Sequence, residues 1–370
     1  MSKALKTTFL SFLFLTIITS CSSNETNTII KLPTSPASVD YSIKNQLSPT
    51  IPIPKSQIIS KSPLKPQLPS PPLVKIEKDY TIVKSPNIPD TKYPIKITRS
   101  DNKEIIINKS PEKIIAFDSA AVEILYSINA GNKIIGTHSF VTYPKDSKNI
   151  TKVGDAFNLN IEKVLSLNPD LFYIFFERYI NDLEKNNIKV IYEKTLNDNF
   201  EAIPSRILMW GKIVNKNNEA YNIANQFEIK LFKIKSFFKN YQEGPTIFYD
   251  TGSLWTPGNN TLVGKTFNLL KLNNIAKDVS GYKQFSKEIL IKKNPQIIIT
   301  SDPDFFYKNT EFKNLTAIKN KRILTLDSDS LSIAGPRFID GIEELIEKIY
   351  SPIYINNIYE QASNQWNKFR

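Results

Sequence analysis

The sequence predicts an α/β protein with two α/β lobes with parallel sheets, joined by one long helix, and a ligand cleft between the lobes. Strand-like apolar runs alternate with helical segments in two separate stretches, which is the pattern of parallel βαβ units. A helix–strand unit with the same Asn-Pro break recurs at 161–175 and 287–300. Between these stretches, apolar or small residues recur at steps of three or four over 217–241, as in a long helix. With 370 residues, the chain is long enough for two domains.

Residues 1–20 read as a signal peptide. Lys3 and Lys6 precede an apolar run over 8–19 that is too short to span a bilayer comfortably. Cys21 is the only cysteine and lies at the end of this run, where the sequence resembles the bacterial lipoprotein signal. We therefore expect a lipidated Cys21 at the mature N-terminus, with an incidental cysteine after an ordinary signal peptide as the alternative. No disulfide, thiol nucleophile or Cys-ligated metal is then expected.

Residues 21–94 are expected to form the lipid anchor and a Pro-rich disordered tether. Residues 22–94 hold 13 of the 23 prolines and no glycine. This composition favours an extended, solvated chain, which at full stretch would reach on the order of 200 Å. A Pro-rich segment that binds a partner is the alternative.

Residues 95–205 are expected to form the N-terminal α/β lobe. A hairpin is predicted at 95–108, because two apolar runs flank the turn sequence SDNK. Strands are predicted at 113–117, 133–136, 171–176 and 189–193, and helices at 119–131, 162–167 and 181–187.

Residues 206–243 are expected to form the connecting helix region, in which Trp210 lies at helical spacing and is predicted to be core. Gly244-Pro245 ends this region, and the α/β rhythm restarts in a C-terminal lobe over 244–350. The last segment, 351–370, is a tail. In this lobe, strands are predicted at 246–250, 296–300 and 322–327, and helices at 266–272, 287–293 and 337–349.

Charge and motifs exclude several function classes. The formal charge is +12, but no run of five or six basic residues marks a nucleic-acid site, so no nucleic acid is expected. The phosphate-loop-like stretch 258–266 has five residues between its glycines, where the motif needs four. Nucleophile-elbow and HExxH motifs are absent. We expect no enzyme activity and no cofactor, although a carboxylate-based glycosidase leaves no motif by which to exclude it.

An ordered set of short stretches over about 95–350 resembles the substrate-binding proteins of ABC importers, in their iron–siderophore and cobalamin branch. The stretches are SPEKIIA (110–116), EIL (123–125), Gly136 with Tyr143-Pro144, KVG (152–154), IEKVLSLNPDL (161–171) and AGPRFIDGIEEL (334–345).

The resemblance implies a monomeric lipoprotein on the outer side of the plasma membrane, facing the periplasm or the exterior. It would deliver cobalamin or a ferric siderophore to an ABC permease with its ATPase. A binding protein for haem or another metal chelate is the alternative, as is a lipid-anchored sensor with the same fold. Tyr143-Pro144 occurs in cobalamin-type members and leans toward that ligand.

In the resembling family, each lobe presents one surface glutamate to arginines of the permease. The matching positions are Glu162 and Glu288, one at the start of each repeated unit. Carboxylate–arginine pairing is charge-assisted, which suits docking. The alternative is that a glutamate at a helix start only complements the helix dipole.

The ligand is expected beyond the carboxyl ends of the strands, where open α/β sheets bind ligands. That places seven candidates in the cleft loops: Asp118, His138, Phe140, Tyr143, Trp255, Tyr282 and Arg337. The aromatic members would pack on a large flat ligand.

Four of these candidates carry open alternatives. His138, the only histidine, either contacts the ligand or is structural, and alone it forms no zinc cage. Direct binding of ferric iron by oxygen atoms of Asp118 or Tyr143 is an alternative, although no protein metal site is expected. Arg337 either faces an anionic ligand or pairs with Asp340, three residues on.

Overall fold

The computed structural model describes residues 87–195, 199–327 and 329–350. The signal peptide, Cys21, most of the tether and the C-terminal tail therefore lie outside the described residues. Among the residues that are described, no helix is both long and apolar enough to cross a membrane.

Lobe one contains a five-stranded parallel sheet with the strand order β5-β4-β3-β6-β7. The strands are β3 (Ile114–Phe117), β4 (Ile134–Thr137), β5 (Thr151–Lys152), β6 (Leu171–Ile174) and β7 (Val190–Tyr192). Helices α1 (Ser119–Ser127), α2 (Ile161–Leu167) and α3 (Ile180–Lys185) follow β3, β5 and β6 in the chain. Short 3₁₀ turns lie at Gly131–Lys133, Lys145–Asn149 and Phe200–Ala202.

Both faces of this sheet are buried, which explains why its strands are continuous apolar runs. Side chains alternate between the two faces of a strand. Ile114 and Ala116 of β3 belong to one core cluster with residues of α1. Ile115 and Phe117 belong to a second cluster with residues of α2 and α3.

Lobe two contains a four-stranded parallel sheet with the order β10-β8-β12-β13. The strands are β8 (Thr246–Asp250), β10 (Asn273–Asn274), β12 (Ile297–Thr300) and β13 (Ile323–Leu324). An antiparallel ribbon of β9 (Trp255–Pro257) and β11 (Tyr282–Gln284) lies outside this sheet. The helices are α6 (Leu262–Leu269), α7 (Lys287–Lys293), α8 (Pro303–Lys308), α9 (Thr316–Lys319) and α10 (Phe338–Ile349), with 3₁₀ turns at Thr310–Phe312 and Ser330–Ser332.

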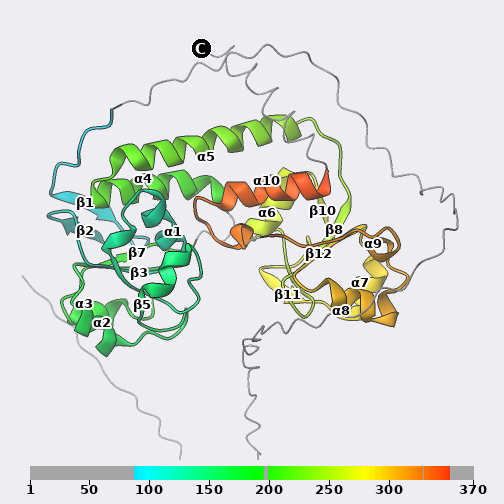
Figure 1. The fold of residues 1–370 in the computed structure, drawn as a ribbon, viewed down its shortest axis with the longest axis horizontal. Coiled ribbons are helices and arrows are strands. Elements are labelled where there is room, and N and C mark those ends of the chain that lie inside the picture. Colours follow the sequence, from blue (N-terminus) through cyan, green and yellow to red (C-terminus); the bar gives the residue numbers. More distant parts are fainter. Residues whose placement is uncertain (1–86, 196–198, 328, 351–370) are drawn as a thin grey trace, which may run out of the picture. The chain divides into compact units, whose positions relative to one another are not determined.

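Two packed helices connect the lobes. The predicted long helix is α5 (Asn217–Phe238), and α4 (Ile203–Val214) packs along it, as Figure 1 shows in green. The two meet closely at Gly211, where an added Cβ would lie 2.3 Å from the Ala220 Cβ. Trp210 is fully buried, which confirms its predicted place in the core. The sequence pattern does not separate α4 from α5, because the break between them is a short turn at Asn215 with φ of 54°.

The repeated unit has a local cause. Asn160 and Ser286 accept a hydrogen bond from a backbone N–H in the first turn of α2 and α7. Each helix ends at an asparagine in the left-handed conformation, Asn168 or Asn294, and a proline follows. Each unit is therefore a short capped helix that stops sharply before a buried strand.

The N-terminal hairpin of β1 (Ile95–Thr98) and β2 (Glu104–Ile107) forms as the sequence predicts. The preceding residues, which the sequence analysis assigned to the tether, also bond to the body. The backbone of Ile88 exchanges two hydrogen bonds with the Asn218 amide, at 2.7 and 3.1 Å. The Thr91 N–H donates to Asn215 Oδ1 at 2.7 Å. The segment 88–93 therefore lies at the turn between α4 and α5.

Helix α6 begins at Leu262, four residues before the predicted start. Thr261 caps it, because its hydroxyl accepts from the Gly264 N–H at 3.0 Å. An added Cβ at Gly264 would lie 2.0 Å from the Gly258 carbonyl oxygen. The two glycines of the phosphate-loop-like stretch are therefore explained by close packing of the chain on itself.

Candidate functional site

Asp118 follows β3 and caps α1. Its Oδ1 accepts from the N–H groups of Ala120 and Ala121, at 2.6 and 3.1 Å, and the side chain is buried. This is the hydrogen bonding of a helix cap, which needs a short side chain with an acceptor oxygen. The predicted contact of Asp118 with ligand stays a prediction beside this structural role.

His138 follows β4 and is 4% exposed. Its Nε2 lies 3.3 Å from the Ser119 hydroxyl, and its ring is edge-on to Phe117 at 5.5 Å. Burial lowers the pKa of His138, because a charged imidazolium is costly away from water. Its Nδ1 is buried and has no hydrogen-bond partner among the described residues. A neutral histidine therefore lies under the loop that carries Phe140, whose ring is 6.4 Å away.

Large aromatic side chains are exposed beyond the carboxyl ends of the lobe-one strands. Phe140 and Tyr143 follow β4, as predicted. Phe157 follows β5 and is 70% exposed, although the sequence analysis did not select it. Its loop is fixed by Asp155, whose Oδ1 accepts from the Phe157 and Asn158 N–H groups at 2.8 Å. The sequence signal that could have identified Phe157 was an aromatic residue just after a turn-forming Asp that follows a strand.

In lobe two, Trp255 and Tyr282 lie on the β9–β11 ribbon. Trp255 pairs with Gln284 and Tyr282 with Pro257, so the two aromatic side chains share one face of the ribbon. Both are nearly half exposed. The ribbon follows a turn held by Asp250, whose Oδ1 accepts from the N–H groups of Gly252 and Leu254. This turn presents the ribbon just beyond the carboxyl end of β8.

Tyr249 lies close to this ribbon. Burial raises the pKa of Tyr249 to about 12, and the nearby Tyr282 and the carboxylates of Glu344 and Asp329 add to the rise. Tyr249 therefore stays neutral at physiological pH.

Arg337, at the start of α10, joins the two lobes. Its Nη2 lies 2.5 Å from Glu123 Oε1 of lobe one and 3.0 Å from Asp329 Oδ1 of lobe two. Its Cζ lies 3.6 Å from the centroid of the Tyr143 ring, a cation–π contact. Asp340, the alternative partner, pairs instead with Lys230 of α5 at 2.8 Å. The pairing of Arg337 with Asp340 was therefore wrong, because α10 turns Asp340 toward α5.

Glu123 is a partner of Arg337 that was not predicted from the sequence. It lies among five other buried residues of α1, from Ala120 to Leu125, and is itself 4% exposed. A charged residue is rarely buried without a partner. The sequence signal for such a buried, paired charge was a single glutamate in an otherwise apolar helix stretch. The identity of its partner could be learned only from the folded structure.

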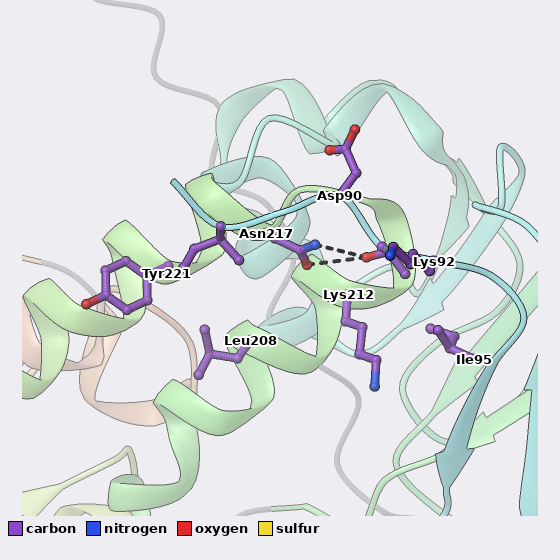
Figure 2. Close-up of a pocket in the computed structure, with 9 residues that line it drawn as sticks. Asp90, Lys92, Ile95, Leu208, Lys212, Asn217 and Tyr221 are labelled. Carbon is purple, nitrogen blue, oxygen red and sulfur yellow. Dashed lines mark hydrogen bonds between the residues drawn. The ribbon is translucent and has the colours of Figure 1, made fainter. Parts of the chain in front are cut away.

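A cavity of about 390 Å³ lies away from these residues. Figure 2 shows it between the segment at Asp90 to Ile95 and the helices α4 and α5, with Leu208 and Tyr221 on its helical side. None of the seven predicted ligand residues lines it. The cavity therefore gives no support to the predicted cleft.

Glu162 and Glu288 are both exposed, each on the second residue of its short helix. The hydrogen bond from Ser286 lowers the pKa of Glu288, so its carboxylate stays ionised at neutral pH. Both side chains are therefore accessible to a partner. Their role in docking stays a prediction.

Residues 114–330 match the family described as periplasmic binding protein. The match takes in both sheets and the helices between them. The chain belongs to this family. An uncharacterized ABC transporter substrate-binding lipoprotein of Bacillus subtilis is 30% identical over 274 residues, which cover 70% of this chain and 86% of that protein. A vitamin B12-binding protein of Pectobacterium atrosepticum is 24% identical, with 65% of this chain and 88% of that protein covered.

Solved structures share the fold of this periplasmic binding protein. A possible iron-binding, periplasmic solute-binding protein from Staphylococcus epidermidis aligns with a TM-score of 0.55 and 28% identity, over 65% of this chain and all of that chain. The periplasmic vitamin B12-binding protein of Vibrio cholerae aligns with a TM-score of 0.58 and 23% identity, over 65% of this chain and 97% of that one. The α/β fold with two lobes and a long connecting helix is thus confirmed.

The named relatives are substrate-binding transport proteins and not enzymes, which agrees with the predicted function class. Within the described residues, no three His, Cys, Asp or Glu side chains form a group that would hold a metal ion.

Proposed function

We propose that this periplasmic binding protein captures a metal chelate, cobalamin or a ferric siderophore, and delivers it to an ABC permease with its ATPase. It would do so as a monomeric lipoprotein anchored through Cys21 on the outer face of the plasma membrane. Haem or another chelate is the alternative ligand, and a lipid-anchored sensor is the alternative role.

The observation that carries this proposal is the pair of exposed aromatic groups beyond the carboxyl ends of both sheets. Phe140, Tyr143 and Phe157 lie in lobe one, and Trp255 and Tyr282 lie in lobe two. Exposed apolar patches on a soluble protein mark surfaces that bind ligands or partners. A large ligand with apolar faces, such as a corrin or a ferric chelate, would cover rings from both lobes at once.

The relatives named as vitamin B12-binding proteins support the cobalamin branch over the alternatives. Four such proteins from Pectobacterium and Vibrio are 24–26% identical to this chain over about two thirds of its length. Cobalamin is therefore the first ligand to test.

The test is a calorimetric and fluorescence titration of the purified full chain with cobalamin, then with ferric siderophores and haem. We expect saturable binding with a Kd below about 1 μM, which corresponds to roughly 8 kcal/mol. Trp255→Ala should weaken binding about tenfold or more through loss of a ring contact, while Trp255→Phe, the matched control, should retain most of the affinity. Failure of every chelate to bind would refute the proposed function.

A further inference from the structure

Arg337 is already paired with carboxylates of the protein itself. Its guanidinium lies between two carboxylates, Glu123 at 2.5 Å and Asp329 at 3.0 Å, and rests on the Tyr143 ring. Its side chain is only 17% exposed. An anionic ligand would therefore have to displace a carboxylate from Arg337 before it could use the positive charge.

Displacing Glu123 is unfavourable, because its carboxylate is buried in lobe one. An added Cβ on Gly335 would lie 2.7 Å from Glu123 Oε2, so this glycine lets the loop before α10 close over the carboxylate. Oε2 has no hydrogen-bond partner within the described residues, so Arg337 is what compensates the charge. Removing one member of a buried ion pair leaves the other charge uncompensated, which is strongly unfavourable.

The cluster of Glu123, Asp329 and Arg337 borders the aromatic groups of both lobes. Tyr143, under the guanidinium, belongs to the exposed aromatic group of lobe one. In lobe two, Asp329 of the cluster and Tyr282 of the ribbon both raise the pKa of Tyr249 through electrostatic interaction. Two carboxylates face one guanidinium, so the cluster has a net charge of −1 when all three groups are ionised.

We infer that this cluster makes the site select neutral or cationic metal chelates and reject anionic ones, with Glu123 and Asp329 as the specificity-determining residues. The inference rests on the proposed function and narrows its ligand class. Like charges across an interface disfavour a partner, and desolvation strengthens this effect. Chelates with free carboxylates or a trianionic catecholate shell are thereby disfavoured.

The experiment measures Kd by calorimetry for four probes on the full chain: cyanocobalamin and ferrichrome, which are neutral, ferrioxamine B, which is cationic, and ferric enterobactin, which is anionic. We expect the wild type to bind its best neutral or cationic probe at least about tenfold more tightly than the anionic one. Tighter binding of ferric enterobactin than of the other three would overturn the inference but leave the proposed function standing. If the chain binds none of these four probes and does not bind haem, the proposed function is overturned, and the inferred ligand class with it.

Two variants assign the selectivity to the carboxylates. Glu123→Gln keeps the shape and an oxygen acceptor for Arg337, and should improve binding of the anionic probe about tenfold while changing that of the neutral probes less than about threefold. Asp329→Asn removes the other carboxylate of the cluster. Because the Asp329 side chain is 53% exposed, this variant tests the effect of the negative charge even if Glu123→Gln does not fold. Lys230→Gln, a charge change on α5, is the matched control. Unchanged selectivity in both carboxylate variants would contradict the assignment.

Discussion

Asp118 has two candidate roles, as a ligand contact and as a helix cap. Its position after a strand marks it as a ligand candidate, while its hydrogen bonds to Ala120 and Ala121 are those of a helix cap. The two roles make different predictions, because a cap stabilises the fold whether or not a ligand is bound.

Asp118→Ala is expected to lower the free energy of unfolding by about 1 kcal/mol, since two N–H groups of α1 lose their acceptor. Asp118→Asn keeps an acceptor oxygen and should cost less. Urea denaturation of the ligand-free chain measures both values. If Asp118→Ala weakens chelate binding but leaves stability unchanged, the cap is not its main role.

Burial raises the pKa of Glu123, in spite of its bond to Arg337. The folded state therefore binds this proton more tightly than the unfolded state, whose carboxyl has a pKa near 4.5. Stability from this group is fully present below pH 4.5 and is lost as the pH rises through the raised value.

The pH dependence is tested by comparing wild type with Glu123→Gln, which carries no titrating group there. The stability of the wild type relative to the variant should fall as the pH rises from 4.5 toward 8, as followed by denaturant unfolding. A difference that grows with pH would show that the bond to Arg337 outweighs burial and lowers the pKa instead.

At the scale of elements, α4 and α5 set the joint between the lobes. They approach so closely at Gly211 that its hydrogen faces the Ala220 methyl group. Lys230 then ties α5 to Asp340 and Glu343 of α10, at 2.8 and 3.0 Å. The connecting helix is thus packed on both the N-terminal and the C-terminal parts of the body.

Gly211→Ala is expected to destabilise the fold by about 1–3 kcal/mol, because the added methyl group forces α4 and α5 apart. Leu208→Ala on the same helix is the matched control, since Leu208 is 42% exposed and should cost much less. Thermal unfolding compares the two. Equal losses would mean that the α4–α5 contact adapts without strain.

The helices of the repeated unit were predictable because their signals are local, whereas α8 and α9 were not predicted. The limits of α2 and α7 follow from a capping side chain and an Asn-Pro stop, all within ten residues of sequence. The short strands β10 and β13 and the ribbon of β9 and β11 were missed or misjudged in length. Two or three residues have no periodicity to detect, and their strand state comes from a partner far along the chain.

At the scale of the whole molecule, Glu162 and Glu288 repeat the same local position once per lobe. Both are exposed, and each is the second residue of a short helix that a side chain caps. Such a pair suits a partner that carries two basic sites, one for each lobe.

Reversing both charges, with Glu162→Lys and Glu288→Lys, should abolish chelate uptake by cells and leave chelate binding by the purified chain within about twofold, because docking and capture use different surfaces. Lys163→Glu and Lys287→Glu, the neighbouring residues, serve as charge-change controls. Normal uptake by the double variant would contradict a docking role and leave the helix dipole as the reason for these glutamates.

Local sequence patterns were enough to predict the two α/β lobes, the long helix, the buried Trp210 and the loops that carry the aromatic candidates. Each depends on periodicity, caps or turn residues that lie close together in the chain. The contact of Arg337 with Glu123, 214 residues away, and that of Asp340 with Lys230 depend on how the helices pack. A charge finds its partner through the packing of whole elements, and no local pattern encodes which distant carboxylate that packing brings within reach.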